Sequence, residues 1–158
     1  PEGSAPPMYQ RSHSIKAEVV IPKSGANGVI VAEGGSEGGF SLYLENGIPV
    51  YEYNFFAQSY YRIAATKALA PGKHTIVVDY QQTPREGRHG IGGPVTISVN
   101  GDMVAQGQVE KVVPYRFSAT ETFDIGMDLG STVSPRYNEK APYAFTGQID
   151  TVTIDLKD

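Results

Sequence analysis

Residues 40–55, FSLYLENGIPVYEYNF, decide the fold class of this chain. Apolar and polar side chains alternate over residues 40–45, and the alternation resumes over residues 48–55, as in β-strands. Asn46 and Gly47 separate the two runs. This dipeptide tolerates positive φ at both central positions of a type I′ turn, whose twist matches that of two paired antiparallel strands. The stretch therefore predicts a β-hairpin.

The same pattern extends in both directions from this hairpin. A second Asn-Gly pair, Asn100-Gly101, also lies between two alternating runs, so it predicts a second hairpin. Residues 29–32 form a short apolar run of the kind that a sandwich buries on both faces. Further short runs with strand character cover residues 15–21, 60–64, 73–81, 123–126 and 152–156.

These runs predict an all-β fold. Residues 59–69 alone could be scored as a helix, but their tyrosine pair and β-rich context favour a strand followed by a loop. No helix alternates with the strands, which excludes a parallel α/β sheet. We expect a two-sheet antiparallel β-sandwich of the jelly-roll type with about 10–12 strands.

The composition narrows the classes of protein. The chain has 158 residues, 40% of them hydrophobic, which suits one globular domain. Cysteine is absent, which excludes a disulfide framework, a thiolate zinc site and a cysteine nucleophile. The formal net charge is −4 and no dense Lys/Arg run occurs, so no nucleic-acid partner is expected. No apolar run approaches the roughly 20 residues of a membrane span, so we expect a soluble chain without a membrane partner.

The N-terminal stretch has the composition of a linker. Residues 1–7, PEGSAPP, lack the basic start and the apolar centre of a signal peptide. We expect residues 1–13 to be a linker or an extended N-terminal segment and residues 14–158 to be a single β-sandwich domain. Because the chain starts with Pro, we interpret it as a fragment of a longer protein. The compartment stays open, since disulfide-free domains occur on both sides of a membrane.

Two aspartates offer a possible metal site. Asp124 and Asp128 come at and after a short apolar strand, in a loop that contains Gly126 and Gly130. Calcium takes 6–8 oxygen ligands, often carboxylates and loop carbonyls, although the spacing here is not that of an EF-hand. Two interpretations stay open: a calcium site at Asp124 and Asp128, or ordinary turn chemistry with solvent-exposed acids and no cofactor.

No catalytic residue is predicted. Residues 34–38, GGSEG, match the nucleophile-elbow pattern, but that motif needs a following helix and a strand follows here. A glycine-rich hairpin loop is the better interpretation. His13, His74 and His89 are isolated and match no metalloprotease spacing.

The densest aromatic stretch is a candidate interaction surface. Residues 51–61 hold six aromatic side chains, whereas one strand face can send only alternate residues into the core. Phe56, Tyr60 and Tyr61 lie at or beyond the end of the expected strand. We interpret these three as an interface or ligand-binding surface, the alternative being that all of them are buried in the core.

Seven blocks of the sequence form a recognisable series. They are residues 28–35 (GVIVAEGG), 38–43 (GGFSLY), 50–55 (VYEYNF), 69–76 (LAPGKHTI), 109–117 (VEKVVPYRF), 121–128 (ETFDIGMD) and 145–152 (FTGQIDTV). In this order they resemble the C-terminal accessory domain of bacterial arylsulfatases, and the resemblance covers about residues 14–156. More distantly, the hairpins and the ending around Phe145 resemble concanavalin A-type and laminin-G-like jelly rolls.

The resemblance implies a non-catalytic role beside a catalytic partner. Sulfatases of this family hydrolyse sulfate esters with a formylglycine made from Cys or Ser, and the nearest phrase here, residues 134–136, lacks the spacing of that motif. We therefore expect a domain that packs on an N-terminal sulfatase catalytic domain or shapes its cleft. The alternative is a lectin-like module that binds glycans, with or without the help of calcium.

Overall fold

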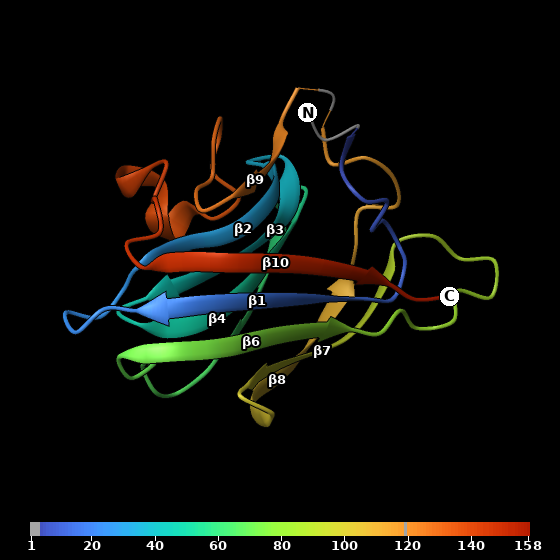
Figure 1. The fold of residues 1–158 in the computed structure, drawn as a ribbon. Helices are drawn as coiled ribbons and strands as arrows, with labels where there is room; N and C mark the ends of the chain where they lie inside the picture. The colour runs from blue at the N-terminus through green and yellow to red at the C-terminus, as the bar shows by residue number, and fades with distance from the viewer. Residues whose placement is uncertain (1–3, 119) are drawn as a thin grey trace.

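The computed structural model describes residues 4–118 and 120–158 as two five-stranded antiparallel sheets packed face to face (Figure 1). Sheet A has the order β10-β1-β6-β7-β8, and sheet B has the order β5-β4-β3-β2-β9. The ten strands confirm the predicted antiparallel sandwich. Their bounds are β1 His13–Ile21, β2 Gly28–Gly35, β3 Gly38–Glu45, β4 Ile48–Phe55, β5 Ser59–Ala64, β6 Gly72–Tyr80, β7 Ile91–Val99, β8 Asp102–Lys111, β9 Thr122–Ile125 and β10 Gln148–Leu156.

The two predicted Asn-Gly turns are confirmed. Asn46 and Gly47 have φ of 52° and 78° between β3 and β4, and Asn100 and Gly101 have φ of 53° and 88° between β7 and β8. Positive φ at both positions is the mark of a type I′ turn. Residues 34–38 form the β2–β3 hairpin, as expected from the strand that follows them.

The main core lies between the sheets. Alternate residues of each strand point inward, for example Ile15 from β1 and Leu42 from β3, and both are fully buried. Residues 1–3 of the expected N-terminal linker lie outside the described residues. Residues 4–12 precede β1, and Met8 packs against the core with 4% of its surface exposed.

A second, smaller core lies on the outer face of sheet B. Residues 127–146, which we call the covering segment, include a short 3-10 helix, η2 (Pro135–Lys140), and pack over β2, β3 and β4. Val133, Tyr137 and Tyr143 of this segment contact side chains of sheet B, among them Tyr43. Because both faces of the sheet are covered, every residue of β2 is buried. This confirms the expectation for residues 29–32.

The outer face of sheet A, by contrast, is polar and open. Lys16 and Glu18 of β1 lie on it beside Thr75 of β6 and Thr151 of β10. Within residues 4–118 and 120–158, no helix has the length and apolar character needed to cross a membrane.

At Gly28 the backbone of the covering segment approaches sheet B closely. Gly28 has φ of 107°, and a Cβ there would overlap the backbone of Ala144, whereas Gly25 has φ of 81° with open space around it. We expect Gly28→Ala to lower the free energy of unfolding by about 3 kcal/mol or more, because steric overlap adds to the cost of the left-handed backbone.

The matched control for this test is Gly25→Ala, which should cost only about 1 kcal/mol, the penalty of positive φ alone. Urea denaturation of both variants measures the difference. Equal losses would mean that the covering segment can shift away from β2 without cost.

Candidate functional site

Asp128 braces the covering segment from within, and its partner Tyr137 links the segment to sheet B. Its Oδ2 accepts a hydrogen bond from the Val133 amide at 2.9 Å and another from the Tyr137 hydroxyl at 2.5 Å. The same hydroxyl lies 3.0 Å from Ser41 Oγ on β3. Asp128 is fully buried, and its Oδ1 has no hydrogen-bond partner among the described residues. Burial raises the pKa of this carboxyl to about 6, and the charges of Asp124 and Glu121 add to the effect.

Asp124 holds the loop before Asp128. Its Oδ2 accepts from the Thr122 hydroxyl at 2.6 Å and from the Leu129 amide at 2.9 Å. Both predicted aspartates therefore lie under one loop, where they satisfy backbone amides rather than facing solvent. Among the described residues, no three His, Cys, Asp or Glu side chains gather in a way that could hold a metal ion.

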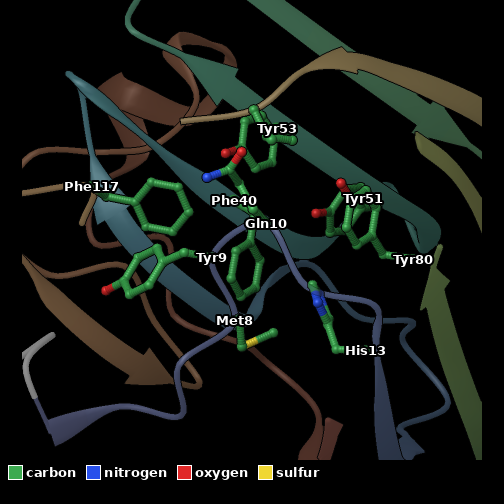
Figure 2. A pocket seen from close by; sticks show the side chains of 10 residues that line it. Met8, Tyr9, Gln10, His13, Phe40, Tyr51, Tyr53, Tyr80 and Phe117 are labelled. Atoms are coloured by element: carbon green, nitrogen blue, oxygen red, sulfur yellow. The ribbon is translucent and has the colours of Figure 1, made fainter. Parts of the chain in front are cut away.

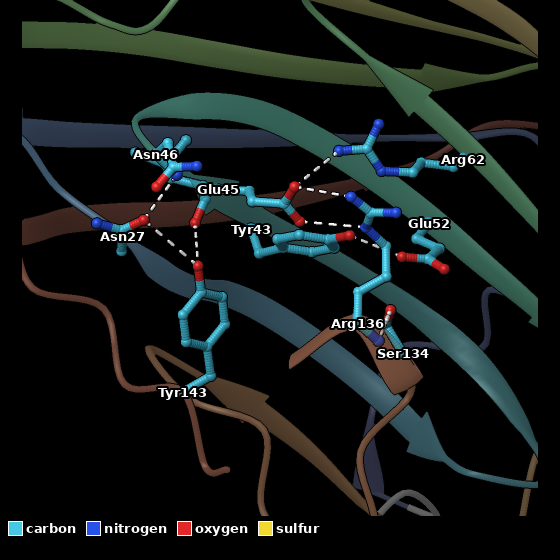
Figure 3. A network of polar contacts seen from close by, with 10 residues as sticks. Asn27, Tyr43, Glu45, Asn46, Glu52, Arg62, Ser134, Arg136 and Tyr143 are labelled. Carbon is cyan, nitrogen blue, oxygen red and sulfur yellow. Dashed lines mark hydrogen bonds and ion pairs between the residues drawn. The ribbon is translucent and has the colours of Figure 1, made fainter. Parts of the chain in front are cut away.

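A polar network lies at the margin of the covering segment (Figure 3). Arg136 of η2 binds Glu45 of β3 through two nitrogens, at 3.2 and 2.8 Å, and Arg62 of β5 reaches the same carboxylate at 3.4 Å. These arginines hold the pKa of Glu45 below its usual range. Glu52, 2% exposed, accepts from the Tyr43 hydroxyl at 2.7 Å. The Arg136–Glu45 pair therefore fixes η2 to the sheet.

The three predicted interface aromatics differ in exposure. Phe56 and Tyr60 each expose 40% of their surface. Tyr60 pairs with Asn54 and shares the outer face of sheet B, whereas Tyr61 pairs with Tyr53 and packs half-buried against the main core. The alternative that all three are buried in the core is therefore wrong for Phe56 and Tyr60.

The mouth of the main core contains a small aromatic cavity (Figure 2). The cavity has a volume of about 20 Å³, which suits roughly one water molecule. His13 borders it: Nδ1 lies 2.8 Å from the Arg11 carbonyl oxygen, and Nε2 has no hydrogen-bond partner among the described residues. Burial lowers the pKa of His13. The cavity is lined by Met8, Tyr9, Gln10, His13, Phe40, Tyr51, Tyr53, Tyr80, Val112 and Phe117.

A surface groove lies beside this mouth, and sequence reasoning missed it. We call it the N-terminal groove; it encloses about 590 Å³ of space open to solvent. Gln10 ties the groove to two loops, because its Nε2 donates to the Pro114 carbonyl at 2.7 Å and its Oε1 accepts from the Gly90 amide at 2.9 Å. The groove is lined by Gln10, Arg11, Ser12, Gln82, Thr83, Pro84, Arg85, Lys157 and Asp158.

An exposed aromatic pair stands next to the N-terminal groove. The rings of His89 and Tyr115 lie 6.3 Å apart with an interplanar angle of 31°, and Tyr115 exposes 69% of its surface. We call this pair the aromatic shelf. The residues that build the groove and the shelf come from four separate parts of the sequence, so no local motif announces them. The one available signal was the basic loop at residues 85–89.

Comparison with solved structures places the fold. The chain is similar to a heptameric SAP-like pentraxin from Limulus polyphemus, with 14% identity and a TM-score of 0.55 over 94% of this chain and 66% of the pentraxin. It is also similar to the CBM40 of the Ruminococcus gnavus IT-sialidase bound to α2,3-sialyllactose, with 15% identity and a TM-score of 0.61 over 95% and 79% of the two chains.

A third similar structure is the receptor-binding domain of botulinum neurotoxin type G, with 12% identity and a TM-score of 0.59 over 92% of this chain and 34% of the toxin chain. No protein-family model and no curated protein sequence matches the chain. At these identities the likeness shows the fold alone, a two-sheet jelly-roll sandwich. It gives no support for a sulfatase origin.

The raised pKa of Asp128 predicts a pH dependence of stability. An unfolded Asp titrates near 3.9, so the folded state favours the protonated form. This contribution is fully present below about pH 4 and is lost as pH rises through about 6, with a ceiling of about 3 kcal/mol. We expect Asp128→Asn to flatten the loss of unfolding free energy between pH 4 and 7.5, measured by urea denaturation.

Asp102→Asn serves as the control, because Asp102 is an exposed carboxylate in β8. Its profile should follow that of the unaltered chain. Parallel profiles for all three proteins would show that the Asp128 carboxyl titrates alike in the folded and unfolded chains.

Proposed function

We propose that this chain is the non-catalytic C-terminal β-sandwich domain of an arylsulfatase-type sulfatase and that it packs on the catalytic domain or shapes its cleft. The parent enzyme would hydrolyse sulfate esters, and this domain would supply none of the reacting groups. The ordered sequence blocks that resemble the accessory domain support the parentage. The exposure of Phe56 and Tyr60 is the observation that carries the packing role.

The β4–β5 hairpin holds Phe56 in an unusual conformation. Phe56 and Ala57 have φ of 50° and 55°, and the Gln58 amide donates to the Phe55 carbonyl at 2.9 Å, so a type I′ turn is built without glycine. Bulky residues avoid positive φ, and such strain is concentrated at functional positions. The ring of Phe56 packs edge-on against Phe55 at 4.8 Å but remains 40% exposed. A partner surface that covers it would gain the burial that this chain does not provide.

A second candidate function is glycan binding. The observation that favours it is the likeness to jelly-roll domains that include a CBM40 bound to sialyllactose. That protein's ligand is not transferred to this chain, but the N-terminal groove and the aromatic shelf have the concave, polar and aromatic character that sugar sites use.

Calcium at Asp124 and Asp128 belongs to this second candidate. The unpartnered Oδ1 of Asp128 supports it, because a buried carboxylate oxygen without a donor is a suitable ligand for a hard cation. The remaining ligands would be loop carbonyls.

The packing role is tested in the longer polypeptide. The coding sequence upstream of residue 1 should encode a sulfatase catalytic domain with a formylglycine motif. In that polypeptide, Phe56→Ser with Tyr60→Ser should lower the melting temperature of the catalytic domain by roughly 2–4 °C, because about 1 kcal/mol of interface burial is lost. In residues 1–158 alone, the same pair should change the unfolding free energy by no more than about 0.5 kcal/mol.

Met103→Ser is the matched control, since Met103 is an exposed apolar side chain in β8. It should leave the melting temperature of the catalytic domain and the unfolding free energy of residues 1–158 unchanged. An upstream sequence without a sulfatase domain would overturn the parentage. A correct upstream domain with no effect of the double variant would overturn only the packing through this hairpin.

The calcium proposal is tested by thermal unfolding of residues 1–158. An ion that binds only the folded state raises the melting temperature as its concentration increases. We expect a rise of a few degrees at millimolar calcium, roughly 1 kcal/mol or more of linkage, and its loss in Asp128→Asn. Magnesium is the control ion. An unchanged melting temperature with calcium would reject the site.

A further inference from the structure

Basic charge gathers at the end of the sandwich where β1 begins. The loops at residues 81–90 and 112–118 together contain Arg85, Arg88 and Arg116 but only one acid, Glu86. All four residues are exposed, and Arg88 forms an ion pair with Glu86 at 3.6 Å. The rest of the chain is acidic, because the formal net charge of the whole is −4. These two loops therefore carry a net positive charge in an acidic chain, which complements an anion.

The two loops are held together by specific contacts rather than by chance proximity. Gln10 bridges Pro114 and Gly90, and the Val112 amide donates to the Gly90 carbonyl at 2.9 Å. These bonds place the two rings of the aromatic shelf side by side. The most exposed large apolar or aromatic side chain of the described residues, Tyr115, thus stands on a braced loop.

The N-terminal groove adjoins these loops and holds three basic side chains, two of which are paired. Arg11 is paired with Asp158 at 3.1 Å, and Lys157 is paired with Asp79 at 2.5 Å. Arg85 also lines the groove, and no ion pair is formed by its side chain within the described residues. A guanidinium without a carboxylate partner keeps its planar fork of donors available for a bidentate anion.

We infer that the N-terminal groove and the aromatic shelf bind a sulfated glycan. A sugar ring would stack on Tyr115, and sulfate-ester oxygens would accept hydrogen bonds from Arg85 and Arg116. An oligosaccharide with separate sulfate groups suits this surface better than a nucleic acid, because a long, evenly charged polymer would also meet the acidic remainder of the chain. This inference rests on the second function proposed above and names its site and ligand class.

The test uses residues 1–158 and a chondroitin sulfate hexasaccharide, with its desulfated form as the matched ligand, measured by isothermal titration calorimetry. We expect desulfation to weaken binding about tenfold or more, because charge-assisted contacts to the arginines are lost. Tyr115→Ala should weaken it about tenfold, and Arg85→Ala with Arg116→Ala by a similar factor. Affinity should also fall as salt concentration rises.

Lys16→Ala and Lys73→Ala are the matched charge controls, because both lysines are exposed and lie away from the loops of the site. They should change the affinity less than about twofold. Equal binding of the two hexasaccharides, or full binding by the Tyr115 and arginine variants, would overturn this site while leaving glycan binding itself in place. Equal affinity for a DNA oligonucleotide of similar length would show a general polyanion surface and overturn the ligand class. If neither the hexasaccharides nor sialyllactose binds, the site and the glycan-binding function both fail.

Discussion

The outer face of sheet B needs a cover. Tyr43 and Val50 project from it, so without a cover their apolar surface would be exposed to water. Glu52 lies beside them and accepts a hydrogen bond from the Tyr43 hydroxyl. The covering segment removes this surface from water. Asp128 holds the segment in shape by accepting from the Val133 amide and from the Tyr137 hydroxyl, which also bonds Ser41 of β3. A buried carboxyl is expensive to desolvate, and its raised pKa reflects that cost. The segment is held on the sheet by the Tyr137 hydroxyl at Ser41, the Tyr143 hydroxyl at the Leu44 carbonyl and the Arg136–Glu45 pair.

Covering that face decides where function can lie. A ligand cannot reach the middle of sheet B, because η2 is joined to the strands beneath it by the Arg136–Glu45 ion pair and by the edge-on contact of Tyr137 with Tyr43. The open face of sheet A is polar and carries no exposed aromatic cluster among its described residues. Among the described residues, the exposed large aromatic side chains are Phe56 and Tyr60 at the β4–β5 hairpin and Tyr115 beside the N-terminal groove. Both proposed functions therefore use aromatic side chains that the covering segment leaves exposed.

The two proposed functions use different residues and are physically compatible. Phe56 and Tyr60 belong to sheet B and its hairpin, whereas the N-terminal groove is built by residues before β1, the loop after β6 and the end of the chain. A domain could pack on a catalytic partner through the first surface and hold a glycan on the second. The correction concerns the aspartates: Asp124 and Asp128 are not solvent-exposed turn acids but buried loop anchors. Burial gives both carboxyl groups backbone amides as hydrogen-bond partners.

Local patterns determined the strands and the turns. The alternation of residues 40–55 and the two Asn-Gly pairs required only neighbours in the sequence, because strand periodicity and type I′ geometry are local properties. The exposure of Phe56 also followed from the limited capacity of one strand face. The partner of Asp128, the fate of the outer face of sheet B, and the meeting of Gln10 with Gly90 and Pro114 were settled only by tertiary structure. Those contacts join residues 9 to 104 positions apart, and no spacing in the sequence encodes which distant loop a side chain will meet.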